Sequence, residues 1–130
     1  MAERAAPSTK PVLQKLLLKP GSRALVLKAP ADYLEQFPGD VTVEQQLGDG
    51  AYDFIQLFAT RREELTAEGT KLRQALKPGG LLWVAYPKGK AVPTDLNRDV
   101  VRTTLADVGL EVVTQVAIDD TWSALRAKVV

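Results

Sequence analysis

Residues 72–88, with the sequence LRQALKPGGLLWVAYPK, decide which fold the chain is expected to adopt. The first part predicts the end of a helix, because Pro78 cannot continue one and Gly79 and Gly80 accept the left-handed angles that terminate one. The apolar run at residues 81–85 has no polar alternation, which is typical of a strand covered on both faces. A helix, a glycine turn and a buried strand form half of a βαβ crossover.

Helical and extended patterns alternate along the rest of the chain. Helices are expected at residues 11–19, 31–37, 61–76 and 96–108, and strands at residues 23–28, 41–45, 52–59, 81–87, 110–118 and 122–130. The turn at residues 119–121 is short enough to make the last two strands an antiparallel hairpin. This order predicts an α/β fold: a three-layer sandwich with a mostly parallel sheet and a C-terminal hairpin.

The capping residues of two helices are also predicted. Thr60 and Glu63 have the spacing of a capping box at the start of the helix that follows the second buried strand. Thr94 or Asp95 is expected to cap the next helix, and Gly109 to end it.

The connection at residues 46–51 is too short for two neighbouring strands of a parallel sheet. Residues 46–51 follow the strand expected at residues 41–45, whereas a parallel crossover ordinarily needs a dozen residues or more. The strand at residues 41–45 must therefore be very short or pair differently from the others.

Composition excludes several classes of function. The 130 residues suit one domain, expected at residues 11–130 after a flexible tail at residues 1–10, and the net charge of +1 gives no bulk attraction to nucleic acid or to an acidic membrane. The sequence has no cysteine and no histidine, which removes thiolate chemistry, the commonest general base and the commonest metal ligands. With no apolar stretch of about 20 residues and no signal-peptide core, a cytoplasmic location is expected.

Three motifs carry a resemblance to a known family. Residues 19–27 (KPGSRALVL), 52–55 (YDFI) and 76–82 (LKPGGLL) are similar to the approach to the first strand, the fourth strand and the turn into the fifth strand of class I S-adenosylmethionine-dependent methyltransferases. The resemblance covers residues 16–130. It implies a Rossmann-like fold, and methyl transfer with S-adenosylmethionine as the expectation to test.

The chain departs from that family where the cofactor would bind. The first loop of the family carries a Gly-x-Gly turn, because only glycine lets backbone N–H groups approach the ligand closely. The corresponding residues 28–33 (KAPADY) contain no glycine and include Pro30, which has no N–H. The family places an acidic residue at the end of the second strand to hold the ribose hydroxyls, and Glu44 is the nearest candidate. One strand and at least one helix are also missing, so no cofactor is predicted.

A second resemblance covers nearly the whole chain after the tail. Residues 87–101 (PKGKAVPTDLNRDVV) and 117–126 (AIDDTWSALR) resemble a compact bacterial family, a domain of unknown function with the same truncated methyltransferase-like outline. This resemblance implies fold and kinship, and no activity.

Ligands of open parallel sheets bind beyond the carboxyl ends of the strands. In this chain four cations lie at or after those ends and could form a positive rim for a phosphate or carboxylate ligand: Lys28, Arg61, Lys88 and Lys90. The alternative is that they are solvated loop residues with nothing bound.

The hairpin turn offers further candidate residues. Asp119 and Asp120 precede Trp122, but two adjacent carboxylates are a weak metal signal because Asp is favoured in turns. Asp119 could instead pair with a rim lysine or cap the hairpin, and Trp122 could stack on a ligand or cover the sheet. Trp83 is expected in the core, and Asp53 is expected to be a hydrogen-bonded structural acid.

The sequence favours a non-catalytic cytoplasmic binding or interaction domain, with a small anionic ligand or a protein as its partner. The missing strand leaves one short sheet edge, through which a homodimer could form. Two alternatives stay open. One is a divergent methyltransferase that uses residues 28–33 and Asp53, and the other is an anion or nucleotide sensor built on Arg61, Lys88 and Lys90.

Overall fold

The computed structural model describes residues 12–88 and 92–129, so the expected tail at residues 1–10 and the candidate Lys90 lie outside the described residues. The elements are, in chain order, α1 (Val12–Lys15), β1 (Arg23–Leu27), the 3₁₀ helix η2 (Tyr33–Gln36), β2 (Thr42–Glu44), β3 (Tyr52–Phe58), α2 (Arg62–Ala75), β4 (Leu76–Pro87), α3 (Arg98–Ala106), β5 (Leu110–Ala117) and β6 (Trp122–Val129). None of the described helices is long and apolar enough to cross a membrane.

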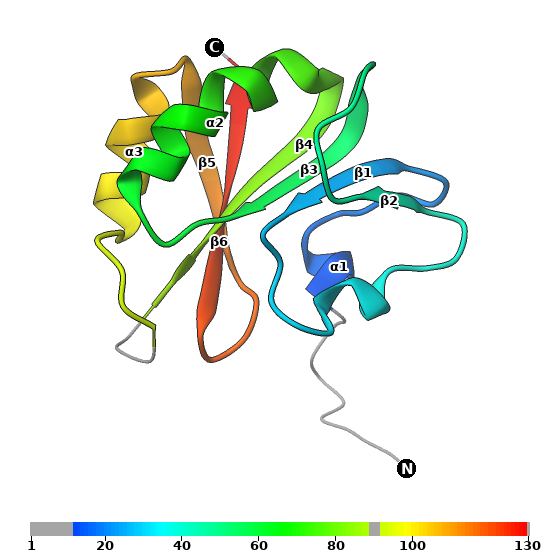
Figure 1. Ribbon diagram of the computed structural model, residues 1–130, viewed down its shortest axis with the longest axis horizontal. Helices are drawn as coiled ribbons and strands as arrows, with labels where there is room; N and C mark the ends of the chain where they lie inside the picture. Colours follow the sequence, from blue (N-terminus) through cyan, green and yellow to red (C-terminus); the bar gives the residue numbers. More distant parts are fainter. Residues whose placement is uncertain (1–11, 89–91, 130) are drawn as a thin grey trace.

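The six strands form one sheet with the order β2-β1-β3-β4-β6-β5 (Figure 1). The first four strands in this order run parallel, while β6 is antiparallel to both β4 and β5. The predicted mostly parallel sheet with a C-terminal antiparallel hairpin is therefore confirmed.

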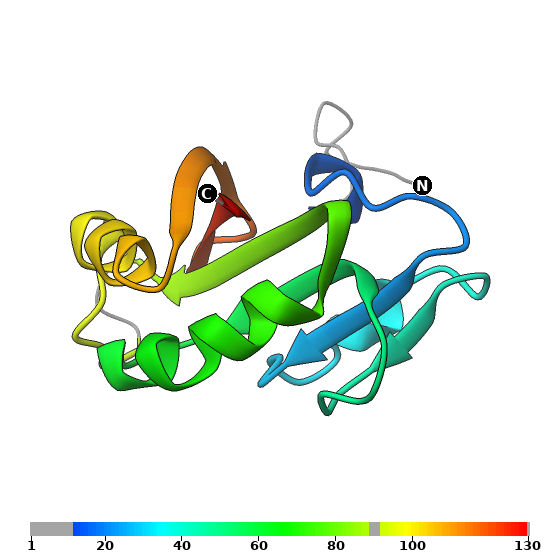
Figure 2. The ribbon, with the colours of Figure 1, turned by 90° about the horizontal axis from the view of Figure 1, so that it is seen from above.

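Two hydrophobic cores cover the two faces of the sheet, because successive side chains of a strand point to opposite faces. The helices α2 and α3 cover one face, and α1 with η2 covers the other (Figure 2). On β1, for example, Leu25 belongs to the first core and Val26 to the second. The three layers are confirmed, but the second helical layer is thin: α2 has 14 residues, while α1 and η2 have four each.

Trp83 joins the thin layer to the sheet. Its side chain is fully buried in the second core, as predicted, and its indole Nε1 donates a hydrogen bond of 2.9 Å to the carbonyl of Leu16. The helix α1 is shorter than the predicted residues 11–19, because Leu17 adopts the left-handed region with φ 66°.

The length of β2 explains how the short connection before β3 is possible. It has three residues and pairs in parallel with β1, so the expectation of a very short strand is confirmed. A strand of three residues rises only about 10 Å, and residues 45–51 can therefore return without a helix to the amino edge, where β3 begins.

The boundary between α2 and β4 differs from the prediction. The helix ends at Ala75, and Lys77, Pro78 and the two glycines belong to β4. They bulge out of the sheet, because Tyr52 pairs with Leu76 whereas Phe54, only two residues later, pairs with Leu81. Gly79 takes a φ of 79°, which allows this bulge.

Both predicted helix caps are wrong by a few residues. Glu64, and not Glu63, closes the capping box of α2, since its side chain accepts from the N–H groups of Thr60 and Arg61. Asn97 caps α3 by accepting from the N–H of Val100.

Thr94 and Asp95, the predicted caps of α3, make other contacts. The Thr94 hydroxyl donates to the Thr60 carbonyl, and the Asp95 carboxylate accepts from the N–H of Arg62 at the start of α2. They therefore fix the connection before α3 against the start of α2.

Candidate functional site

The loop that follows β1 occupies the carboxyl edge of the sheet, where this kind of fold binds ligands. Its backbone turns sharply, because Lys28 and Asp32 both adopt left-handed angles, with φ of 60° and 68°. A hollow of about 370 Å³ lies on one side of the loop and includes Glu35 and Gln45 in its wall. A smaller hollow of about 160 Å³ lies beside η2 and the hairpin turn.

Aromatic side chains form one wall of the smaller hollow. Phe58 makes edge-to-face contacts with Tyr33 and Trp122, at ring-centroid distances of 4.9 Å and 5.1 Å. Burial raises the pKa of Tyr33 to about 12, and its hydroxyl donates to the Oε1 of Gln56 at 2.8 Å. The Nε2 of Gln56 is buried and finds no acceptor among the described residues. The ring of Trp122 thus packs on Phe58 and also lines this hollow.

Two of the predicted rim cations are paired with carboxylates of α2. The Nζ of Lys28 lies 2.5 Å from the Oε2 of Glu64, and the Nε of Arg61 lies 3.0 Å from the Oε1 of Glu63. Burial of Glu64 opposes its ionisation, but the hydrogen bonds from Lys28 and from two backbone N–H groups outweigh burial and lower its pKa. The charges of two of the four predicted rim cations are therefore compensated.

The other predicted site residues have different surroundings. The backbone N–H of Lys88 donates to the carbonyl of Thr121 at 2.8 Å. The Oδ1 of Asp119 accepts from the N–H groups of Thr121 and Trp122, both at 2.8 Å, so Asp119 caps the hairpin turn. The structure brings Asp119 and Trp122 together beside the smaller hollow, and places Lys28 and Arg61 at the start of α2.

The sequence did not predict a polar cluster around the end of β2. Arg23 forms a two-point ion pair with Glu44, at 2.7 Å and 3.1 Å, and its guanidinium lies 4.1 Å above the centre of the Tyr52 ring. The Tyr52 hydroxyl donates to Glu44 at 2.7 Å and accepts from the N–H of Gly48 at 2.9 Å. The hydrogen bonds from Arg23 and Tyr52 lower the pKa of Glu44.

The residues that the family resemblance assigns to S-adenosylmethionine do not fit the cofactor in the structure. Both carboxylate oxygens of Glu44 already accept hydrogen bonds within the cluster. Pro30 in the first loop has no N–H to donate, and Lys28 in the same loop is paired with Glu64. In the described residues no group of three or more acidic side chains is placed to hold a metal ion.

Comparison with known proteins supports the fold alone. No protein-family model and no curated protein matches the chain. A S-adenosylmethionine-dependent methyltransferase from Aquifex aeolicus is 19% identical with a TM-score of 0.72, and the alignment covers 92% of this chain and 88% of that one. The CcbJ methyltransferase from Streptomyces caelestis is 11% identical with a TM-score of 0.60, and the alignment covers 91% of this chain and 87% of that one. Aeropyrum pernix fibrillarin, in complex with natively bound S-adenosyl-L-methionine, is 16% identical with a TM-score of 0.57. That alignment covers 91% of this chain and 68% of the fibrillarin chain.

The chain thus has the Rossmann-like fold of the S-adenosylmethionine-dependent methyltransferases. At these identities the likeness does not assign an activity. The resemblance to a bacterial family of domains of unknown function stays a prediction.

Proposed function

We propose that this chain is a non-catalytic binding or interaction domain of the cytoplasm, which keeps the methyltransferase fold without binding the methyl donor. The observation that carries the proposal is that Glu44 is already engaged by neighbouring side chains. In the resemblance it is the candidate for holding the cofactor ribose, yet here it neutralises Arg23 and accepts from Tyr52. Removing it from these contacts would leave the Arg23 charge half-buried and without its partner.

The position of Asp53 argues against the divergent methyltransferase that the sequence left open. Asp53 is the second residue of β3 and lies at the amino edge of the sheet, whereas the loop at residues 28–33 lies at the carboxyl edge. Its carboxylate accepts from the N–H of Arg23 at 2.8 Å and from the Nζ of Lys77 at 3.1 Å. The two parts of the supposed site are therefore at opposite ends of the sheet, and Asp53 is a structural acid as predicted.

Thermal melting of the full chain tests the proposal. A ligand at about 100 times its dissociation constant adds about 2.7 kcal/mol to the free energy of unfolding, or several degrees to the melting temperature. We expect no shift with S-adenosylmethionine or with its demethylated product, S-adenosylhomocysteine. A shift of several degrees with either compound would contradict the proposal and favour the alternative of a divergent methyltransferase.

A homodimer through the short β2 edge remains part of the proposal. The edge strand offers only the backbone groups of Thr42–Glu44 for pairing with a second copy. Light scattering at two protein concentrations measures the mass in solution. A mass of two chains that persists on dilution supports the dimer, and a mass of one chain at both concentrations excludes it.

A further inference from the structure

The amino edge of the sheet, opposite the usual ligand edge, carries two adjoining hollows. The first has a volume of about 320 Å³ and lies between β1, β3 and the bulge of β4. The second, of about 510 Å³, lies between the end of α2, the same bulge and the end of β6. Lys77 and the residues up to Gly80 form a ridge that lines both hollows.

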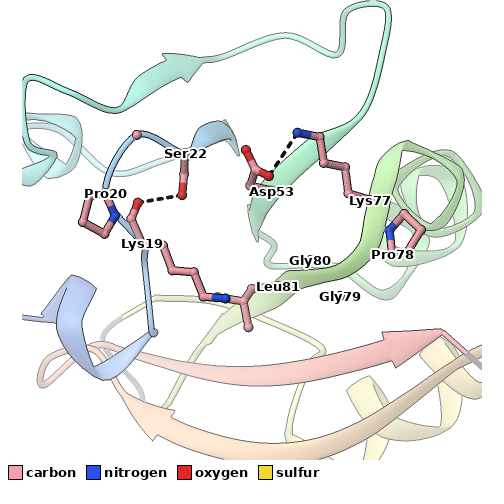
Figure 3. A pocket seen from close by; sticks show the side chains of 10 residues that line it. Lys19, Pro20, Ser22, Asp53, Lys77, Pro78, Gly79, Gly80 and Leu81 are labelled. Carbon is pink, nitrogen blue, oxygen red and sulfur yellow. Dashed lines mark hydrogen bonds and ion pairs between the residues drawn. The ribbon is translucent and has the colours of Figure 1, made fainter.

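The first hollow is nearly neutral. Two cations, Lys19 and Lys77, and one carboxylate, Asp53, line it. Figure 3 shows the ammonium group of Lys77 turned toward Asp53, with which it forms an ion pair at 3.1 Å. The hydrogen bond from the Arg23 N–H, followed by that from Lys77, lowers the pKa of Asp53. An anion entering this hollow would meet the Asp53 carboxylate.

The second hollow is strongly positive. Arg73, Arg126 and Lys128 line it together with Lys77, and none of the described residues in its wall is acidic. Neither Arg126 nor Lys128 has a hydrogen-bond or ion-pair partner for its charged group within residues 12–88 and 92–129. Like charges around one concavity repel each other unless an anion screens them. Arg73 is held in place by a hydrogen bond of 3.3 Å from its Nε to the carbonyl of Gly109. Arg126 and Lys128 contrast with Lys28 and Arg61 of the carboxyl edge, which are paired with Glu64 and Glu63.

We propose that the hollow between Arg73, Arg126 and Lys128 binds the phosphate group of a small phosphorylated molecule. The planar guanidinium of arginine matches the oxygens of phosphate with two parallel hydrogen bonds. At Gly79 a side chain would meet no atom within 4 Å, so a ligand can approach the backbone of the ridge. The volume lies within the range of small-molecule sites.

None of the described residues that line this hollow is aromatic, which favours a small phosphorylated molecule over a nucleic acid strand. Proteins that bind single strands stack the bases on aromatic rings, and this hollow has no such platform. The site does not depend on the proposed loss of cofactor binding, because it lies at the other edge of the sheet.

Isothermal titration calorimetry of the full chain with inorganic phosphate and with pyrophosphate, at low salt, tests the site. We expect one binding event per chain, tighter for pyrophosphate, and a loss of affinity of at least about tenfold in Arg126→Gln and in Lys128→Gln. Lys71→Gln is the matched control, since it removes the same charge from an exposed position of α2 that lines neither hollow.

Three results would overturn the proposal. One is the absence of heat with both anions for the unaltered chain. Another is an equal loss of affinity in Lys71→Gln, which would show general charge attraction and no defined site. Binding of a single-stranded oligonucleotide without binding of pyrophosphate would likewise exclude the small-molecule site. Melting curves of all variants, compared with that of the unaltered chain, separate a loss of binding from a loss of folding.

Discussion

Trp83 is the residue through which the thin layer of α1 is attached to the sheet. Its ring is fully buried between strands and α1, and its only hydrogen-bond donor reaches the carbonyl of Leu16. A buried indole without such a partner would bear the cost of an unsatisfied donor. The hydrogen bond therefore explains how a helix of four residues can stay on one face of a six-stranded sheet.

Replacing Trp83 with phenylalanine removes this hydrogen bond and leaves a small cavity. We expect Trp83→Phe to lower the free energy of unfolding by about 1–3 kcal/mol. Urea denaturation followed by far-UV circular dichroism measures the loss. Trp122→Phe is the control, because it retains an aromatic ring against Phe58 and the Trp122 indole donates no hydrogen bond within the described chain. Equal losses in the two variants would contradict the role given to Trp83.

At the residue scale, local sequence predicts some roles and misses others. Trp83 could be placed in the core because its neighbours are all apolar, and Asp53 could be interpreted as structural because it sits in a buried strand. The cluster of Arg23, Glu44 and Tyr52 could not be predicted. It depends on the register that pairs Arg23 with Thr42, and this register is set by tertiary contacts.

At the scale of the elements, the start of α2 concentrates several interactions on one side chain. Glu64 accepts from the backbone N–H groups of Thr60 and Arg61, which directly precede the helix, and it also pairs with Lys28 from the loop after β1. Among the described residues, Glu63 pairs with Arg61 alone, at the exposed surface. The cap therefore links the helix to the loop at the carboxyl edge.

We expect Glu64→Ala to destabilise the fold by about 1–2 kcal/mol, as the loss of a helix cap does. The matched variant Glu63→Ala should change the free energy of unfolding by less than about 0.5 kcal/mol, because exposed ion pairs contribute little. Thermal or urea unfolding of both variants provides the comparison. A larger loss in Glu63→Ala would show that Glu63 forms the cap in solution.

The order of the elements could be predicted, whereas their ends could not. Alternating apolar runs and glycine turns identified every strand of the sheet, and the turn at residues 119–121 identified the hairpin. The Lys-Pro-Gly-Gly segment was interpreted as a stop between helix and strand, although it is a bulge within β4. Sequence rules for proline and glycine indicate that a chain bends, and the packing of Gly80 against the Asp53 backbone decides where it rejoins the sheet.

At the scale of the whole molecule, the ionisable groups predict how stability depends on pH. Glu44, Asp53 and Glu64 have lowered pKa values, so their stabilisation is present above the unfolded values of about 4 and is lost as the pH falls through the folded ones. Burial raises the pKa of Tyr33 to about 12 and also raises that of Tyr52. Their stabilisation is present below the unfolded value of about 10 and is lost as the pH rises through the folded values.

The sequence contains no histidine, so no side chain of ordinary pKa titrates between these limits. We expect the urea midpoint to be nearly constant from about pH 5 to 7 and to fall on both the acid and the alkaline side. A change of more than about 1 kcal/mol in the free energy of unfolding within that window would contradict the assignment.

The two edges of the sheet differ in how their charges are arranged. At the carboxyl edge, which related folds use for their cofactor, Lys28 and Arg61 are paired with Glu64 and Glu63. Glu44 is held by Arg23, the first residue of β1. At the amino edge, Arg126 and Lys128 line a hollow to which no acidic side chain of residues 12–88 and 92–129 contributes. The sequence predicted a positive rim on the first edge, because it shows where cations occur along the chain and not which carboxylates they meet.

The most direct test of the central claim, that the methyltransferase fold is kept without its cofactor, is calorimetric titration of the unaltered chain with S-adenosylmethionine and S-adenosylhomocysteine. We expect no heat of binding for either compound, while pyrophosphate binds in the same buffer. Binding of either adenosyl compound with one site per chain would contradict this claim.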